Sequence, residues 1–420
     1  MSYLVGFRCS LCGEVFSPEA IMYTCPRDGG NLDAVYDYAR MQRELDPRWI
    51  AHDTNRAIWH YAPLLPTTLP EPIAALPTPL STLGWTPLYR AQRIEQRLGM
   101  RAVWIKDDTR LPSNSFKDRA SALVIAQAMK IGLHTIAVAS TGNAASALAT
   151  LCAGTPLRAV VFVPQGTPEA KLAGILIHGA RVFIVEGSYT EAVEMATAAC
   201  ARFGWYNRST GFNPYTREGK KTAAYEIAEQ LALHAPTSTR FRAPDVVVVP
   251  VGDGNIISGL HKGFRDLHAL GWIERIPRLI GVTAALAPSL YRAWRSGRED
   301  FDTIPSQTIA SGISVDRPCD GVMALRAVRE TGGVFIEASD EAMLQAMRTL
   351  AVEAGVFVEP ACAATLVGLE EGARQGWIQR DEEVVLQLTG SGFKDVRSAL
   401  RAADQPIPVR TVDEVARALT

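Results

Sequence analysis

Residues 245–255 read DVVVVPVGDGN, an almost unbroken apolar run followed by a glycine-rich turn, and a helical pattern begins at Ile256. A strand that is exposed on one face alternates apolar and polar residues, whereas a strand covered on both faces is apolar throughout. The run therefore predicts a strand buried inside a parallel sheet, and the turn leads the chain into a covering helix.

Seven further segments of the same kind lie between Thr86 and the C-terminus. Helical patterns separate most of them, for example residues 116–130, 189–203 and 217–233. Apolar strands that alternate with helices are typical of an α/β protein, and eight or more strands exceed one comfortable sheet. The sequence therefore predicts two α/β units with parallel sheets and a cleft between them. The further predicted strands are 103–106, 135–140, 159–164, 181–186, 278–283, 334–339 and 384–389.

The composition excludes several classes of protein. The chain has 420 residues, and its 43 Lys and Arg against 44 Asp and Glu give a formal net charge of −1, which argues against a nucleic-acid partner. No apolar run approaches the ~18 residues of a membrane span, and the N-terminus shows no secretory signal. We therefore expect a cytoplasmic protein that binds neither nucleic acid nor membranes.

The cysteines gather near the N-terminus, where three of the seven stand as Cys9-x-x-Cys12 and Cys25. Two turns of the form Cys-x-x-Cys, here called knuckles, would supply the four soft ligands of a zinc ribbon. The second knuckle begins at Cys25, but its fourth residue is Asp28 in place of a cysteine. Three thiolates with one aspartate are an unusual ligand set for zinc. The sequence therefore favours a metal-free, ribbon-shaped unit, with a metal at Cys9, Cys12, Cys25 and Asp28 as the alternative.

A polar turn with the sequence Ser113-Asn114-Ser115-Phe116-Lys117 opens the predicted helix that runs to residue 129. A lysine in the first turn of a helix lies near the positive end of the helix dipole, which disfavours its ammonium form. Lys117 is therefore a candidate nucleophilic amine able to form a Schiff base. The alternative is an exposed lysine paired with Asp118.

Three more turns follow predicted strands. Ser140-Thr141-Gly142-Asn143 offers hydroxyls and N–H groups for a carboxylate, or alternatively a helix N-cap. Gly252-Asp253-Gly254-Asn255 allows the backbone to approach a phosphate at a helix N-terminus, while its spacing fits neither a dinucleotide fingerprint nor a P-loop. Thr389 lies in the turn Thr-Gly-Ser-Gly after the last strand, where it is most often a turn residue.

The joint order of these motifs is more specific than any one of them: SFKDR, STGN, VGDGN after a strand, then LTGSGFKD. In this order the chain resembles the pyridoxal-phosphate enzymes of the tryptophan-synthase-β type (fold type II), and within them most closely the threonine synthases. The resemblance covers about residues 84–400 and includes the segments 213–215, 218–222, 313–315 and 359–361. It implies pyridoxal 5'-phosphate as the cofactor.

The resemblance also implies a domain organisation, with the cofactor in the cleft between two parallel-sheet α/β domains. We expect a large cofactor-binding domain made of residues 36–118 and 209–405, with a small α/β domain, residues 119–208, inserted in it. A degenerate zinc-ribbon-like unit, residues 1–35, precedes them, and a C-terminal tail, residues 406–420, follows.

By the resemblance, Lys117 would carry the cofactor and act as the base, Phe116 would lie beside the pyridine ring, and Asn143 would hydrogen-bond the phenolic oxygen of the ring. Thr389 would meet the pyridine nitrogen with a neutral hydroxyl, which makes the ring a weaker electron sink than a carboxylate partner would. The cofactor phosphate would bind the loop formed by Gly252, Asp253, Gly254, Asn255 and Ile256.

The implied substrate contacts include two departures from the family pattern. In the family, an arginine directly after an Asn-Pro-aromatic triplet is suited to binding the substrate phosphate. Here that position is Thr216, and an arginine, Arg217, follows one place later. Lys220 or Lys221 could replace the arginine as a ligand of the substrate phosphate. Asn114 stands where Gly or Ala is more usual, which we expect to alter the substrate set. The predicted substrate-binding residues are Ser113, Asn114, Ser115, Ser140, Thr141, Arg217 and Lys221.

The activity that the resemblance implies is the conversion of O-phospho-L-homoserine and water to L-threonine and phosphate, by a lyase that works as a homodimer. Three alternatives remain: a serine or threonine dehydratase, a β-replacement enzyme similar to cysteate synthase, and a catalytically silent relative that binds a ligand and regulates through its ribbon.

Overall fold

A computed structural model describes residues 3–20, 23–48, 56–71, 73–235 and 240–419. Its largest sheet has six strands in the order β12-β11-β10-β13-β5-β4. β4 is antiparallel to β5 and the other neighbours are parallel. The strands are β4 (Leu88–Arg90), β5 (Ala102–Asp107), β10 (Val246–Pro250), β11 (Arg278–Ala284), β12 (Phe335–Ala338) and β13 (Glu383–Leu388).

Helices cover both faces of this sheet because its central strands are apolar on both sides. In β10, Val246 and Val248 join one core cluster while Val247 and Val249 join another. The first cluster lies under α4 (Gln92–Leu98), α14 (Asp340–Ala354) and α15 (Pro360–Arg374). The second lies under α10 (Thr222–Leu233), α11 (Asn255–Ala269), α12 (Ser289–Arg295) and α13 (Gly321–Glu330).

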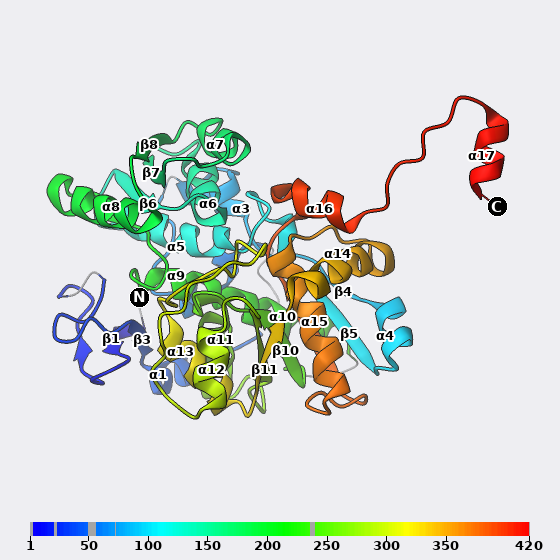
Figure 1. Cartoon of the computed structure of the whole chain (residues 1–420). Helices are drawn as coiled ribbons and strands as arrows, with labels where there is room; N and C mark the ends of the chain where they lie inside the picture. The colour runs from blue at the N-terminus through cyan, green and yellow to red at the C-terminus, as the bar shows by residue number, and fades with distance from the viewer. Residues whose placement is uncertain (1–2, 21–22, 49–55, 72, 236–239, 420) are drawn as a thin grey trace.

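A second, fully parallel sheet has four strands in the order β8-β7-β6-β9. Figure 1 shows it with its helices as a separate layer above the larger sheet. α5 contacts α6 in this layer and α9 below it, so it ties the two parts together. The elements are α5 (Lys117–Lys130), β6 (Thr135–Ala139), α6 (Asn143–Cys152), β7 (Arg158–Pro164), α7 (Glu169–Leu176), β8 (Arg181–Val185), α8 (Tyr189–Phe203), β9 (Tyr206–Asn207) and α9 (Tyr215–Lys220).

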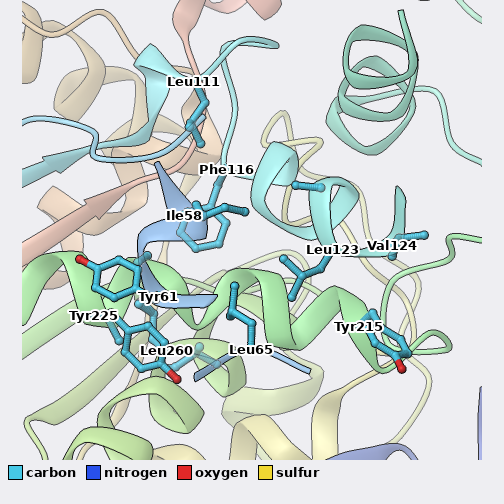
Figure 2. Packing of buried hydrophobic residues seen from close by; sticks show 14 of the residues in the cluster. Ile58, Tyr61, Leu65, Leu111, Phe116, Leu123, Val124, Tyr215, Tyr225 and Leu260 are labelled. Carbon is cyan, nitrogen blue, oxygen red and sulfur yellow. The ribbon is translucent and has the colours of Figure 1, made fainter. Parts of the chain in front are cut away.

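The N-terminal unit is a small antiparallel sheet in the order β2-β1-β3. The arm that follows it wraps the larger body: Ile58, Tyr61 and Leu65 are buried against Tyr225 and Leu260 (Figure 2). The elements are β1 (Leu4–Cys9), β2 (Val15–Phe16), β3 (Leu32–Tyr36), α1 (Tyr38–Glu44), η1 (Ile58–Leu64), η2 (Ile73–Ala75) and α3 (Pro79–Thr82).

Short elements complete the chain, namely η3 (Asp108–Arg110), η4 (Gly392–Lys394), α16 (Val396–Ala402) and α17 (Val412–Leu419). The segment after α16 extends away from the body and ends in α17 (Figure 1). None of the helices that the structure describes is both long enough and apolar enough to span a lipid bilayer.

The predicted fold class is confirmed, and each of the eight predicted strands is present within one or two residues of its expected bounds. In the two larger sheets, two strands were not predicted, β4 and β9, which are only three and two residues long. The domain boundaries at residues 35, 118, 208 and 405 stay a prediction.

Candidate active site

Lys117 is the first residue of α5, and it is only partly exposed. Burial and the neighbouring Arg208 lower the pKa of Lys117, while Asp253 and Glu359 act in the opposite direction. The start of the helix is fixed by the backbone, since the N–H of Phe116 donates to the carbonyl of Thr389 at 2.9 Å. The predicted amine and the predicted turn after β13 therefore lie side by side, and the amine is disposed toward its neutral form.

The glycine turn between β10 and α11 has a backbone that other residues could not adopt. Gly254 has φ of +86°, and a Cβ on it would lie 2.7 Å from the Cβ of Ala324. A Cβ on Gly252 would lie 2.8 Å from the Cα of Ile313. Gly254 is also the N-cap of α11 and has no side chain to cap it, so the first N–H groups of that helix are available to an anion.

Asp320 stabilises this turn through hydrogen bonds to its residues and to the first turn of α11. Its carboxylate accepts from Asn255 Nδ2 at 2.8 Å and from Ser258 Oγ at 2.5 Å, and it pairs with Arg217 at 2.5 Å. Its backbone N–H donates to the carbonyl of Asp253 at 2.8 Å. The turn is therefore fixed before any ligand binds, which lowers the entropic cost of binding one.

Two cationic residues, Lys220 and Arg208, lie near this turn, and the sequence did not indicate that they would come together. Lys220 is fully buried and donates to Asn255 Oδ1 at 2.6 Å. Burial, Lys117 and Arg208 lower the pKa of Lys220 far below its usual range, while Asp253 and Asp320 act in the opposite direction. Arg208 is also fully buried, bonds Ser121 and Thr210 at 3.1 and 2.9 Å, and has its pKa lowered by burial to about 10.

These cations lack the partners that buried cations usually have. Within the described ranges, no carboxylate forms an ion pair with Lys117, Lys220 or Arg208. A buried charge without a counter-ion is costly, and Arg208 lowers the pKa of both Lys117 and Lys220. The cluster is therefore suited to an anionic ligand at the glycine turn.

Glu359 forms the opposite side of the site. Its Oε1 accepts from Asn143 Nδ2 at 2.9 Å, and burial raises the pKa of Glu359 against the opposing effects of Lys394, Asn143 and Lys117. A Cβ on Gly390 would lie 2.3 Å from Glu359 Oε1, so a side chain there would displace the carboxyl group. The site thus has one carboxyl group that is disposed to keep its proton.

In the turn between β6 and α6, the hydroxyl groups of Ser140 and Thr141 do not cap the helix. The N-cap of α6 is Gly142, so Ser140, Thr141 and Asn143 do not take the capping position that was the alternative interpretation. Ser140 and Thr141 are both partly exposed, and Ser140 Oγ accepts from the N–H of Gly142 at 3.2 Å. Their hydroxyls can meet a carboxylate at the helix N-terminus.

The segment before Lys117 explains one departure from the family pattern. Asn114 has φ of +58°, in the left-handed region that glycine and asparagine tolerate best, and its side chain is exposed. Asparagine there preserves the backbone that glycine would give. Ser113 and Ser115 are buried with their Oγ atoms 3.2 Å apart, and Thr389 is buried with its N–H on Cys362 Sγ at 3.1 Å.

Two predicted substrate-binding residues are placed elsewhere, and one predicted neighbour of the cofactor is fully buried. The ring of Phe116 has no exposed surface and packs in the core with Ile58 and Leu123 (Figure 2). Arg217 lies behind the glycine turn, paired with Asp320. Lys221 points away from Lys220 into a buried cluster, where it pairs with Glu218 at 2.6 Å and Asp266 at 2.9 Å. The structure does not bring Arg217 and Lys221 to the site, whereas the place of Phe116 beside a cofactor ring stays a prediction.

The donor set fits a phosphorylated aldehyde. The glycine turn and the unpaired cations suit phosphate, and the amine of Lys117 suits a carbonyl carbon. Together they form a lysine-centred candidate site in an α/β fold, and its chemistry suits a phosphorylated ligand. Residues 80–390 match the pyridoxal-phosphate dependent enzymes, and the chain belongs to that family.

Within that family the chain is similar to threonine synthases over most of its length. It is 33% identical to the threonine synthase of Methanosarcina acetivorans, covering 98% of each chain. It is 33% identical to that of Methanocaldococcus jannaschii over 96% of each, and 34% identical to that of Mycobacterium tuberculosis over 80% of this chain and 89% of the relative.

Solved structures share the fold at lower identity. O-ureido-L-serine synthase aligns with a TM-score of 0.65 at 20% identity, covering 81% of this chain and 99% of that one. Diaminopropionate ammonia lyase from Escherichia coli aligns with a TM-score of 0.63 at 21% identity, covering 76% and 86%. These matches place the chain in the fold and carry no information about its substrate.

Proposed function

We propose that the chain is a threonine synthase that converts O-phospho-L-homoserine and water to L-threonine and phosphate. The family membership and the threonine synthase relatives support this function. The observation that carries it is the pair Lys220 and Arg208, both fully buried beside Lys117 with no carboxylate partner within the described residues. A dehydratase acting on an unphosphorylated amino acid has no second phosphate to neutralise.

The residues around Lys117 would hold pyridoxal 5'-phosphate. The backbone of Gly252 to Ile256 would bind its phosphate, Asn143 its phenolic oxygen and the hydroxyl of Thr389 its ring nitrogen. When bound, the cofactor supplies an electron sink for negative charge on the substrate carbon next to the amino group.

The substrate would be held at both ends. Ser140 and Thr141 would bind its carboxylate at the N-terminus of α6. A phosphate monoester carries about −1.5 to −2 charges at neutral pH, which Arg208 and Lys220 would balance. These two residues replace Arg217 and Lys221 as the proposed phosphate ligands.

Lys117 would move the protons. Because its pKa is lowered, a larger fraction of its amine is neutral and can accept a proton from Cα and then from Cβ. The bond from Cγ to oxygen breaks with its electron pair leaving on phosphate, and Arg208 and Lys220 stabilise that charge. The hydroxyl of water would add at Cβ, and the proton that water leaves would go to the released phosphate. The two protons taken from Cα and Cβ would return to Cα and to Cγ.

The test is to incubate the purified protein separately with O-phosphohomoserine, threonine, serine and O-phosphoserine, and to measure phosphate, threonine and 2-oxo acid. We expect threonine and phosphate in equal amounts from O-phosphohomoserine only. Release of 2-oxobutanoate from threonine without turnover of O-phosphohomoserine would establish the dehydratase instead, and replacement chemistry on O-phosphoserine the cysteate-synthase-like alternative.

Lys117→Ala is the matched control. The variant should lose all turnover together with the visible absorbance of the bound cofactor, because the amine that would bond the cofactor and move the protons is removed. A wild-type protein that binds the cofactor but turns over none of the four compounds would support a catalytically silent relative.

We further propose a cytoplasmic homodimer. The exposed apolar residues at the C-terminal end support a second chain as a partner, since Val412 and Leu419 in α17 are each 83% exposed. Light scattering on the full chain should give twice the mass of 45.6 kDa. A monomer at micromolar concentration would contradict the dimer.

A further inference from the structure

The two N-terminal knuckles have the same backbone geometry. In the first, Cys9-x-x-Cys12-Gly13, the N–H of Gly13 donates to the carbonyl of Cys9 at 3.1 Å, and Gly13 has φ of +76°. In the second, Cys25-x-x-Asp28-Gly29, the N–H of Gly29 donates to the carbonyl of Cys25 at 3.0 Å, and Gly29 has φ of +71°. Asp28 therefore stands in the second knuckle where Cys12 stands in the first.

The hydrogen bond that closes each knuckle is repeated too. The N–H of Cys9 donates to the carbonyl of Glu14 at 2.8 Å, five residues on, and the N–H of Cys25 donates to the carbonyl of Gly30 at 3.0 Å, also five residues on. Such paired turns are the backbone of a ribbon that presents four ligands to one point. The change to Asp28 has altered the ligand and left the turn intact.

The four side chains converge on that point. Their ligand atoms all lie within 4.8 Å of one another. Cys12 Sγ lies 3.8 Å from Cys25 Sγ, and Cys9 Sγ lies 3.2 Å from Asp28 Oδ1. Metal–sulfur bonds of about 2.3 Å and a metal–oxygen bond of about 2.0 Å at tetrahedral angles place two sulfurs about 3.8 Å apart, and a sulfur and an oxygen about 3.5 Å apart.

Backbone N–H groups already support two of the ligands. The N–H of Leu11 donates to Cys9 Sγ at 3.3 Å, and the N–H of Gly30 donates to Asp28 Oδ1 at 2.8 Å. A Cβ on Gly30 would lie 2.6 Å from Cys9 Sγ, so glycine is what allows this approach. Donors of this kind orient ligands and offset their negative charge.

We propose that Cys9, Cys12, Cys25 and Asp28 bind one structural Zn²⁺ ion. Three thiolates favour zinc over the harder divalent cations, and four protein ligands close the tetrahedral site. The sequence favoured a metal-free ribbon because a fourth cysteine is missing. The structure argues for the metal because an oxygen of Asp28 reaches the position of that missing sulfur.

The site is connected to the active site through the backbone of the ribbon. The carbonyl of Ser10, between two ligands, accepts from Arg326 in α13 at 2.6 Å. The carbonyl of Leu32 in β3 accepts at 2.8 Å from Arg217, which pairs with Asp320 behind the glycine turn. We expect zinc to stabilise this wall of the enzyme without touching the substrate.

The test is elemental analysis of the full chain, produced without a metal-binding tag in medium that contains both zinc and iron. We expect about one zinc ion per chain. Cys12→Ser and Asp28→Asn should each lose at least half of it, whereas Cys200→Ser, which removes a buried cysteine from α8, should keep it all.

Cobalt reports on the ligands directly. Protein produced in cobalt medium should show the visible bands of tetrahedral Co²⁺ and thiolate charge-transfer absorption. Asp28→Cys adds a fourth thiolate to three and should raise the charge-transfer intensity by about one third. This readout does not depend on whether the enzyme is active.

Three results would overturn the proposal. One is a wild-type chain with less than about one tenth of an equivalent of zinc, particularly if thiol titration shows Cys12 and Cys25 joined as a disulfide. The second is iron in place of zinc. The third is an unchanged cobalt spectrum in Asp28→Cys, which would remove Asp28 from the ligand set.

Discussion

Two groups of buried charges lie on opposite sides of the first turn of α5. Arg119 donates to Asp108 at 2.7 Å and to Glu226 at 2.6 Å, and Lys106 donates to Glu226 at 2.6 Å. Lys117 lies only two residues earlier on the helix and so points to the other side, toward Lys220 and Arg208. The first group is balanced by its own carboxylates, and the second is not.

The difference separates structural charges from functional ones. A balanced buried network is complete within the protein, whereas an unbalanced cluster remains unfavourable until an anion arrives. Lys220 and Lys221 show this most sharply, since they are adjacent in sequence and both fully buried, yet only Lys221 is paired with carboxylates. Burial alone does not tell the two roles apart, and charge balance does.

The largest expected effect is on the balanced side. Lys221→Met should lower the free energy of unfolding by about 3–5 kcal/mol, because Glu218 and Asp266 would lose the cation between them. Urea unfolding of the cofactor-bound protein measures this change. Lys220→Met, the matched control, should stay within about 1 kcal/mol of the wild type. Equal destabilisation of the two variants would remove the distinction.

The next effect is a pH dependence of the free energy of unfolding, and it comes from Asp118, a buried carboxyl group without a cationic partner in the described residues. Burial raises the pKa of Asp118 from 3.8 to about 7, against the opposing effects of the Ser113 hydrogen bonds and of Lys394, while Asp108 raises it further. The folded state therefore binds a proton that the unfolded state releases above pH 3.8, so stability falls as pH rises from about 4 to about 7 and is level above that.

Asp118→Asn should remove this dependence. Across the same pH range the wild type should lose on the order of 3 kcal/mol relative to the variant. Urea unfolding at a series of pH values measures the difference, in which the other titrating groups cancel. A difference that is constant with pH would show that Asp118 is ionised throughout.

The third prediction is on the catalytic side. Lys220→Met should lower kcat/KM for O-phosphohomoserine about 100-fold, equivalent to ~2.7 kcal/mol, because the substrate phosphate would lose a buried cation. Inhibition by inorganic phosphate should weaken in parallel, and Lys220→Arg should retain both. If cofactor affinity falls instead and phosphate inhibition does not change, Lys220 serves the cofactor phosphate.

The sequence predicted what depends on local pattern. The eight strands follow from continuous apolar runs, and the positions of Lys117, Asn143 and the glycine turn follow from their places at strand ends and helix starts. β4 was missed because three residues, LYR, carry too little pattern to mark a strand.

The pairing of charges could not be predicted, because it depends on tertiary contacts. Arg217, Lys220 and Lys221 all lie in or next to α9, and nothing in their spacing indicates which one meets Asp320, Asn255 or Asp266. Arg208, at the end of β9, was missed because a lone arginine after a two-residue strand carries no motif.

The smallest expected effect concerns a neutral residue at the same site. Because Asn114 has φ of +58° and an exposed side chain, it supports the backbone before Lys117 and should contribute little to substrate choice. Asn114→Ala should lower stability by about 1 kcal/mol, since alanine is strained in the left-handed region, whereas Asn114→Gly should be near neutral. In both variants the ratio of kcat/KM for O-phosphohomoserine to kcat/KM for threonine should change by less than about twofold. Such a change corresponds to less than the thermal energy of ~0.6 kcal/mol. A tenfold change in that ratio in Asn114→Gly would show that substrate choice depends on this neutral side chain as well as on the unbalanced cations.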